Sequence, residues 1–270
     1  MLDKLWLASA VAVVCYSLAF ALRLNHFARA RADTAGSKNS LSAIVAIALI
    51  AHTVASWQQL VTETGLNLSL IPLSVLIFLI INLIVVFSAL KSPLENLYLL
   101  LFPATVAMLV LSRVVIQDSR EISTLAPGLG AHILLSILSY SLMTVAALQA
   151  LLLAWQNRQL HRHHPGGRLK TLPPLQTMEQ LLFRLLLVGF VLLSAGLALG
   201  FFYIDNFFAQ RLAHKTVFSL IAWVVYATLL WGHYRAGWRG KVAVYSTLGG
   251  FAALMLAFWG SKFVFEVLLS

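Results

Sequence analysis

The sequence predicts an all-α protein, a polytopic membrane helix bundle with eight transmembrane helices. Of its 270 residues, 60% are hydrophobic and only 10% are charged, and the mean hydropathy is +0.88. Eight apolar segments each approach the roughly 20 residues that a helix needs to cross a bilayer. None alternates between apolar and polar residues as a transmembrane strand does, and a helix satisfies its backbone within its own segment, so helices are expected.

The eight segments cover approximately residues 5–22, 41–62, 69–90, 97–115, 131–155, 181–203, 215–234 and 243–268. No repeat or soluble segment separates them, so the whole chain, residues 1–270, is expected to form a single integral membrane domain. Asp3 and Lys4 cancel before the first segment and arginines follow it, which is typical of an outward-facing anchor that is not cleaved.

The net charge of +10 is interpreted as a sign of membrane topology and not of a nucleic-acid partner. Twelve lysines and arginines follow the odd-numbered segments, whereas five lie on the opposite side of the bilayer. The positive-inside rule places the basic side in the cytoplasm, so both termini are expected to face outward. The first basic connection, residues 23–40, is expected to be a solvated loop that faces anionic lipid.

A histidine in the second segment is the first candidate functional residue. His52 lies about halfway across the bilayer, and an ionisable group at that depth indicates function by default. The alternative is a neutral imidazole that hydrogen-bonds to a carbonyl or hydroxyl of a neighbouring helix. In the next two segments, Pro72 falls in a first helical turn, where its missing N–H costs little, and Pro103 is expected to bend its helix.

Three more histidines stand near helix ends in the second half of the chain. His132 begins the fifth segment, and His214 and His233 stand at the two ends of the seventh. The stretch HRHHPGG, residues 161–167, is interpreted as a flexible basic loop and not as a metal site, because no acidic or thiol partner is nearby. Small residues in the sixth and eighth segments predict close helix packing.

Two neutral imidazoles that face each other are a usual way to hold haem iron inside a helix bundle. His132 and His214 both lie at the outer ends of their helices, so they are the best matched pair by depth. Arg211 and Lys215 are nearby for the haem propionates. A pair of His52 and His233 would need a tilted helix. We therefore predict haem as the cofactor, b-type or transiently bound, with its iron held through His132, His214 or His233.

Other chemistry is disfavoured. Cys15 is the only cysteine, so neither an intrachain disulfide nor a thiol metal cluster is expected. The sequence lacks HxxxH and HExxH spacings, GxSxG, Walker A and a GxGxxG that opens a helix. The chain is therefore not expected to be an enzyme.

Two stretches of the chain resemble the cytochrome c assembly protein family, the CcsA/CcmC group. They are HILLSILSYSLMTVAALQALLLAW (132–155) and the segment from Lys215 to Leu269. The resemblance covers most of the chain and is strongest over residues 130–268. It is greatest to the HemX/YpjD-like branch, which GLNLSL (65–70) also fits. It implies an eight-helix, haem-handling, multi-pass protein of the bacterial inner membrane with periplasmic termini. In this resemblance His132 matches the outward-facing haem histidine, and His233 matches the histidine that ends the helix after the haem-presenting loop.

One departure from the family pattern bears on function. The CcsA and CcmC proteins present haem with a tryptophan-rich WGxxWxWD loop, whereas the matching segment here, YIDNFFAQRLAH (203–214), has no tryptophan. The resemblance therefore implies haem binding with an accessory or regulatory role in cytochrome c biogenesis. The alternative is a non-haem membrane scaffold or regulatory subunit that binds another membrane protein through the small-residue faces of the sixth and eighth helices.

Overall fold

The computed structural model describes residues 2–28, 35–63, 65–89, 95–115, 121–122, 127–161, 172–203 and 210–260, and their side chains except at 2–5, 35–38, 121–122, 127 and 210–214. In this part of the chain, eight helices are long and apolar enough to cross a membrane, which confirms the predicted all-α, polytopic helix bundle. The chain divides into two compact units, unit 1 (1–123 with 159–173) and unit 2 (124–158 with 174–270). The sequence did not predict this division; the single integral domain and the outward termini stay predictions.

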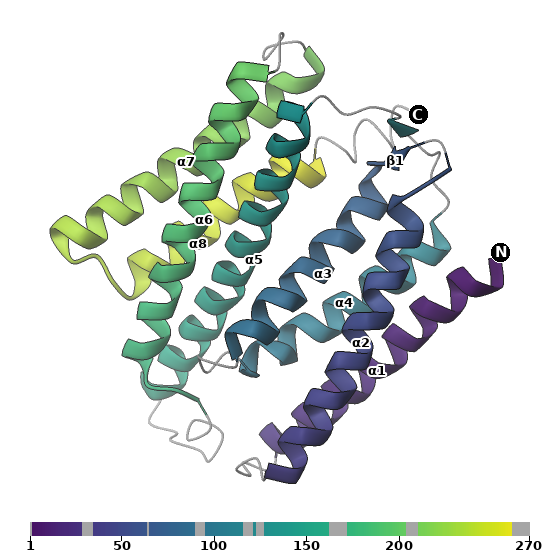
Figure 1. The fold of residues 1–270 in the computed structure, drawn as a ribbon. Coiled ribbons are helices and arrows are strands. Elements are labelled where there is room, and N and C mark those ends of the chain that lie inside the picture. The colour runs from purple at the N-terminus through teal and green to yellow at the C-terminus, as the bar shows by residue number, and fades with distance from the viewer. Residues whose placement is uncertain are drawn as a thin grey trace. The chain divides into compact units, whose positions relative to one another are not determined.

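Unit 1 contains four long helices that form an antiparallel bundle. These are α1 (Leu2–Ala28), α2 (Ala35–Leu60), α3 (Leu70–Ala89) and α4 (Tyr98–Val114), the last preceded by the short 3-10 helix η1 (Glu95–Leu97). Consecutive helices pack side by side, and α4 returns to α1 (Figure 1). Pro72 lies in the first turn of α3, as predicted, and Pro103 lies inside α4.

Polar contacts join neighbouring helices throughout unit 1. Arg113 of α4 donates through both Nε and Nη2 to the hydroxyl of Ser9 on α1. Between α3 and α4, Asn82 Nδ2 donates to Thr105 Oγ1 at 2.8 Å, and both side chains are fully buried. His52 of α2 contacts both α1 and α3. Because lipid tails give helices no hydrophobic reason to associate, such bonds and close packing fix which helices meet and in what register.

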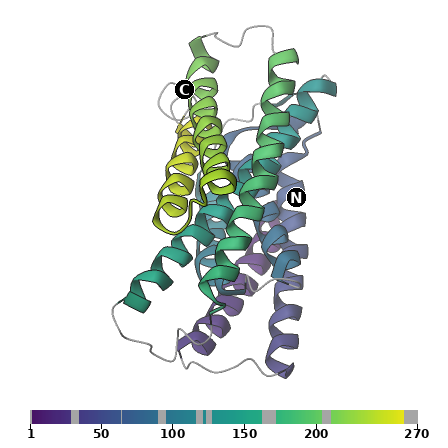
Figure 2. The same cartoon turned by 90° about the vertical axis from the view of Figure 1, so that its left-hand side faces the viewer.

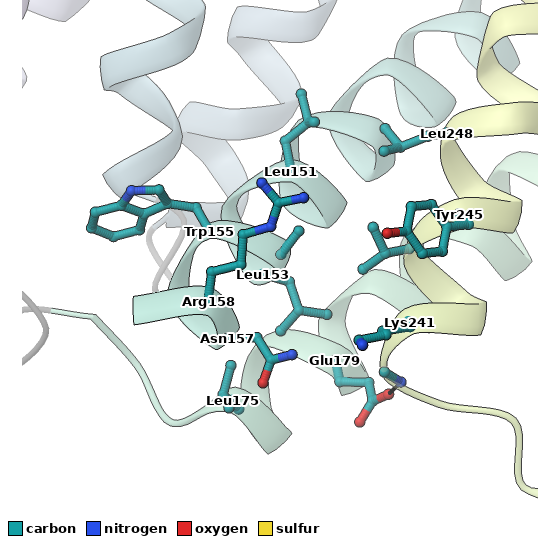
Figure 3. A pocket seen from close by; sticks show the side chains of 13 residues that line it. Leu151, Leu153, Trp155, Asn157, Arg158, Leu175, Glu179, Lys241, Tyr245 and Leu248 are labelled. Atoms are coloured by element: carbon teal, nitrogen blue, oxygen red, sulfur yellow. Dashed lines mark hydrogen bonds between the residues drawn. The ribbon is translucent and has the colours of Figure 1, made fainter. Parts of the chain in front are cut away.

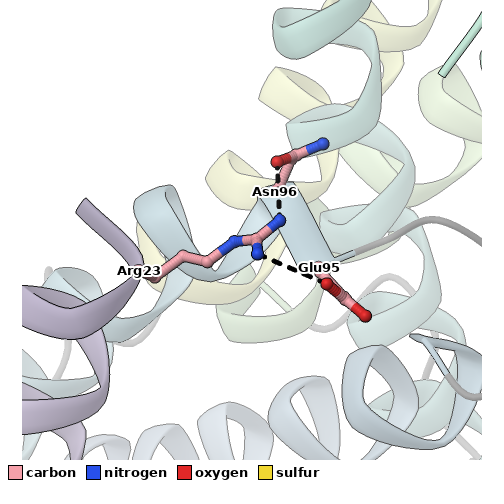
Figure 4. A network of polar contacts seen from close by, with 3 residues as sticks. All are labelled: Arg23, Glu95 and Asn96. Atoms are coloured by element: carbon pink, nitrogen blue, oxygen red, sulfur yellow. Dashed lines mark hydrogen bonds and ion pairs between the residues drawn. The ribbon is translucent and has the colours of Figure 1, made fainter. Parts of the chain in front are cut away.

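The predicted start of the first basic connection was wrong. Helix α1 continues to Ala28, so Arg23 lies inside the helix and not in a solvated loop. Its guanidinium donates to Asn96 Oδ1 at 3.0 Å and pairs with the Glu95 carboxylate at 3.3 Å (Figure 4). A charge this deeply buried is tolerated only when it is paired. Its acidic partner just before α4 was not predicted from the sequence.

Two short strands order part of the connections at one end of unit 1. Strand β1 (Leu66–Asn67) pairs antiparallel with β2 (Glu121–Ile122), with Leu66 opposite Ile122. The Asn67 carboxamide also accepts hydrogen bonds from the backbone N–H and the hydroxyl of Ser69, just before α3 begins. The connection that follows α4 therefore contributes a strand; its residues 116–120 and 123–126 lie outside the described part.

Unit 2 contains α5 (Pro127–His161), α6 (Leu175–Tyr203), α7 (Gln210–Ala236) and α8 (Lys241–Met255), continued by the π-helical turn η3 (Leu256–Gly260). Helices α5 and α6 are antiparallel: Ser139 Oγ donates to the carbonyl of Gly189, and Gln149 Nε2 donates to that of Met178. Helices α7 and α8 lie side by side (Figure 2). Of the predicted loop 161–167, His161 ends α5 and the rest lies outside the described residues.

Most of the predicted small-residue positions serve packing inside unit 2. Gly196 and Gly200 of α6 are buried, and a Cβ at Gly196 would lie 3.5 Å from Ser136 Oγ on α5. On α8, Gly250 is buried beneath the ring of Tyr226, whereas Gly249 is exposed and a Cβ there would meet nothing within 4 Å.

The Gly250→Ala substitution should therefore destabilise the α7–α8 pair. The new Cβ would lie 2.7 Å from Cζ of Tyr226, whose side chain is fully buried, so the ring or the helix would have to shift. Overpacking of this kind costs about 1–3 kcal/mol, which thermal unfolding of the detergent-purified protein would detect. Gly249→Ala is the matched control and should leave stability equal or slightly raised, because alanine favours helix by about 1 kcal/mol over glycine. Equal losses in both variants would contradict this packing argument.

Candidate functional site

His132, in the second turn of α5, is held by α6. Its Nδ1 lies 2.7 Å from the carbonyl oxygen of Gly196, and the side chain is half-buried. A carbonyl can only accept, so Nδ1 carries the proton and Nε2 presents a lone pair. Within the described part of the chain, Nε2 has no hydrogen-bond partner. Histidines that ligate a metal through one ring nitrogen are oriented by a hydrogen bond from the other ring N–H, often to a backbone carbonyl.

A lysine of α7 places a positive charge near His132. Lys215 is half-buried and lies close enough to His132 for its charge to act on the imidazole. Among the described residues it makes no ion pair with a carboxylate. A partly buried ammonium without a counter-charge is suited to an anionic ligand, because a carboxylate would restore the interactions lost with water.

Aromatic contacts hold α7 against α6 close to the Gly196 carbonyl. Trp223 Nε1 donates to the hydroxyl of Ser194 at 2.8 Å, and the indole stacks on Phe190 with 5.6 Å between ring centroids. Ser194 lies two residues from Gly196 on α6, so the helix that carries Lys215 is anchored close to the His132 acceptor. At the end of α6, Phe201 and Phe202 are exposed.

His233 is built into the turn between α7 and α8. Its Nδ1 lies 2.9 Å from the carbonyl of Trp238, and its ring stacks on Phe183 of α6 with 3.4 Å between centroids. The backbone reverses at Gly237, whose φ of 67° favours glycine. The same turn is held to α6 by Gly240, whose N–H donates to Glu179 at 2.7 Å. Nε2 of His233 therefore also has no partner in the described residues. The ring, however, helps to hold the turn between α7 and α8 against α6.

His132 and His233 lie too far apart to ligate one iron. His132 contacts Gly196 and His233 contacts Phe183, and both of these belong to the continuous helix α6. Thirteen residues at 1.5 Å each separate the two contacts by about 20 Å. Both ligands of one haem iron must lie within a few ångströms of each other, so these two histidines cannot share it.

His52 of unit 1 has partners on both ring nitrogens. Nδ1 lies 3.3 Å from the Tyr16 hydroxyl on α1, and Nε2 lies 3.2 Å from the carbonyl of Val75 on α3. The side chain is fully buried. Nε2–H donates to the carbonyl and Nδ1 accepts from the phenol, which is the neutral, hydrogen-bonded alternative that the sequence analysis considered. As a haem ligand His52 stays a prediction that this geometry does not favour.

The other predicted ligand, His214, lies in α7 one residue before Lys215, and its side chain is outside the described residues. Two polar groups were not predicted from the sequence: the Gly196 carbonyl that orients His132 and the Tyr16 hydroxyl that contacts His52. Tyr16 and His52 are polar aromatic groups near the middle of neighbouring apolar helices, a coincidence of depth that could have indicated the pair. Nothing in the sequence marks the carbonyl of one glycine as an acceptor.

Comparison with known proteins shows the family. The sequence profile described as "Cytochrome C assembly protein" matches residues 40–269. The chain belongs to the cytochrome c assembly protein family. This confirms the resemblance inferred from the sequence, which was expected to cover most of the chain.

Three relatives illustrate the range of similarity. Inner membrane protein YpjD of Escherichia coli (strain K12) is 32% identical over 262 residues, which cover 96% of this chain and 97% of the relative. An uncharacterized 28.8 kDa protein of Azospirillum brasilense is 37% identical over 148 residues, 53% of this chain and 55% of its own. Cytochrome c biogenesis protein CcsA of Guillardia theta is 26% identical over 170 residues, 55% and 56% of the two chains. No solved structure matches the chain.

The similarity to YpjD and the eight spans confirm the predicted location, a multi-pass protein of the bacterial inner membrane. Family membership relates the chain to cytochrome c biogenesis.

Proposed function

We propose that the protein binds haem in unit 2 through His132 and has an accessory role in cytochrome c biogenesis. The orientation of His132 carries the proposal: the bond from Nδ1–H to the Gly196 carbonyl leaves Nε2 available as a ligand. Family membership supports it, since one relative is named as a cytochrome c biogenesis protein. The proposal includes no catalytic step.

The residues around His132 fit a haem group. The imidazole would supply the ligand atom, and the Lys215 ammonium would pair with a propionate. Exposed Phe201 and Phe202 near the end of α6 offer apolar surface to a macrocycle. Haem would supply an iron centre, while this chain orients the ligand and places a positive charge beside it. His214 is the proposed second ligand, from its position on α7 alone.

The test is the haem content of the full-length protein, expressed with ample haem and purified in detergent. A pyridine haemochrome assay and a reduced-minus-oxidised spectrum are expected to give close to one haem per chain. A protein that carries no haem under these conditions would refute the proposal.

Lys215→Gln should weaken haem retention without removing the ligand. The variant loses the ammonium proposed to pair with a propionate, and charge-assisted bonds of this kind are worth about 1.5–3 kcal/mol. Transfer of haem from the purified variant to an apo-acceptor protein should therefore be roughly tenfold faster or more. Arg239→Gln, which removes an exposed cation at the other end of the unit, is the control. An unchanged transfer rate in Lys215→Gln would remove this lysine from the site.

A non-haem scaffold is the second candidate function, and the open face of α8 favours it. Val242, Tyr245 and Gly249 of this helix are exposed, and a Cβ at Gly249 would have open space. A partner helix could approach closely there. A stoichiometric partner that co-purifies with the wild type, and that a Gly249→Leu variant loses while keeping its fold, would support this function.

A further inference from the structure

A cavity of about 340 Å³ opens in unit 2 at the end opposite to the proposed haem site. Its walls come from the last turns of α5, the first turns of α6 and the first turns of α8. Its lining includes Leu151, Arg158, Glu179, Lys241, Tyr245 and Leu248 (Figure 3). It uses neither His132 nor Lys215.

Two cations and a phenol line this cavity. Figure 3 shows Arg158 of α5 with Lys241 and Tyr245 of α8, each carrying its polar end toward the space between the two helices. Neither Arg158 nor Lys241 makes an ion pair within the described part of the chain. The carboxylate of Glu179 also lines the cavity, but one of its oxygens accepts the N–H of Gly240 at 2.7 Å. The charged side chains of the lining therefore sum to one positive charge.

The backbone adds to this positive character. Helix α8 begins at Lys241, and its N-cap residue Gly240 has no side chain to bond the free N–H groups of the first turn. The N-terminal end of a helix favours an anion, here in addition to the two side-chain cations.

The rest of the cavity is apolar and continues onto the face of the spans. Leu151, Val244 and Leu248 line it, and Leu151 is 46% exposed on α5. The cavity lies where three helices that are long and apolar enough to cross a membrane begin or end. The ends of such helices come near the lipid headgroups. This is also the side that the positive-inside rule assigns to the cytoplasm, where anionic lipids give the bilayer surface its negative charge.

We infer that this cavity is a binding site for one anionic phospholipid. The phosphate lies between Arg158 and Lys241, the Tyr245 hydroxyl donates to it, and an acyl chain follows Leu151 and Leu248. Basic pockets between transmembrane helices are suited to anionic headgroups, and the apolar wall distinguishes a lipid from free phosphate. The bound lipid would connect α5 with α8 beside the turn that holds His233.

Native mass spectrometry of the full-length protein in mild detergent tests the site. Phosphatidylglycerol and phosphatidylethanolamine with identical acyl chains are titrated separately. We expect phosphatidylglycerol to bind one per chain and to bind roughly tenfold more tightly, and the double variant Arg158→Gln/Lys241→Gln to lose that preference. Both side chains are exposed, so their replacement does not open the core.

The matched control is Arg235→Gln/Arg239→Gln. It removes two exposed positive charges from the same end of the unit, outside the cavity. This control should keep the affinity for phosphatidylglycerol within twofold of the wild type. The charge-conserving variant Arg158→Lys/Lys241→Arg should retain most of the wild-type affinity. Equal binding of the two lipids, an equal loss in the control, or displacement of the lipid by millimolar inorganic phosphate would each overturn the assignment.

Discussion

Replacing His132 with alanine is expected to abolish stoichiometric haem binding. The variant removes the one described imidazole that is both oriented by a backbone carbonyl and close to an ammonium without a counter-charge. An iron ligand cannot be replaced by the methyl group of alanine, so the haemochrome assay should fall from about one haem per chain to less than roughly a tenth of that, since loss of ligand orientation alone already costs 10–100-fold in metal affinity. The fold should persist, because His132 is only half-buried.

The control for this prediction is His233→Ala. Because the contacts of His132 and His233 on α6 are about 20 Å apart, the loss of His233 should leave the haem content unchanged. Its expected effect is local: Phe183 loses its stacking partner and the carbonyl of Trp238 loses its donor. If His233→Ala lost haem while His132→Ala kept it, the site would lie at the α7–α8 turn, and the proposed assignment would be reversed.

A third variant, Gly196→Ala, separates the effect of helix packing from that of ligation by the imidazole. Gly196→Ala leaves the carbonyl in place, and its Cβ would meet Ser136 Oγ at 3.5 Å, an ordinary contact. The variant should therefore retain haem. Haem loss in Gly196→Ala equal to that in His132→Ala would mean that the packing of α5 on α6, and not the imidazole, controls binding.

The sequence alone predicted the helices because the apolar segments are long and their composition differs strongly from that of the connections. Helix ends were less predictable. Arg23 marked a loop by its charge, but Glu95 and Asn96 lie 72 and 73 residues away in sequence and neutralise it inside the bundle. Such pairing depends on which helices are neighbours, and hydropathy contains no information about that.

The same reason explains the uneven success at the histidines. Depth along each helix could be estimated from position, and it made His132 a candidate. The hydrogen-bond partners that distinguish the two histidines come from other helices. His52 has a phenol and a carbonyl, one on each ring nitrogen, whereas His132 has one carbonyl. Apolar sequence around an intramembrane histidine is compatible with both arrangements, so only the three-dimensional contacts separate a structural imidazole from a candidate ligand.

The second large effect is expected at His52, on stability and not on haem. His52→Ala would leave a cavity at a fully buried position and remove the bonds that connect α2 with α1 and α3. Large-to-small changes in a core cost about 2–5 kcal/mol, so the thermal unfolding midpoint in detergent should fall markedly. Tyr16→Phe removes only the hydroxyl that donates to Nδ1 and should cost about 0.6 kcal/mol, the average for side-chain bonds between membrane helices, and at most about 1.7 kcal/mol.

Combining the two substitutions tests whether this stabilisation comes from the bond itself. If the Tyr16 hydroxyl acts through His52, then Tyr16→Phe should cost little in the His52→Ala background, and the two effects should be less than additive. Haem content should stay at the wild-type level in all three variants, because unit 1 has no proposed part in the His132 site. Loss of haem in His52→Ala at unchanged unfolding midpoint would instead make this histidine a ligand, since a purely structural imidazole cannot be removed from a buried position without a loss of stability.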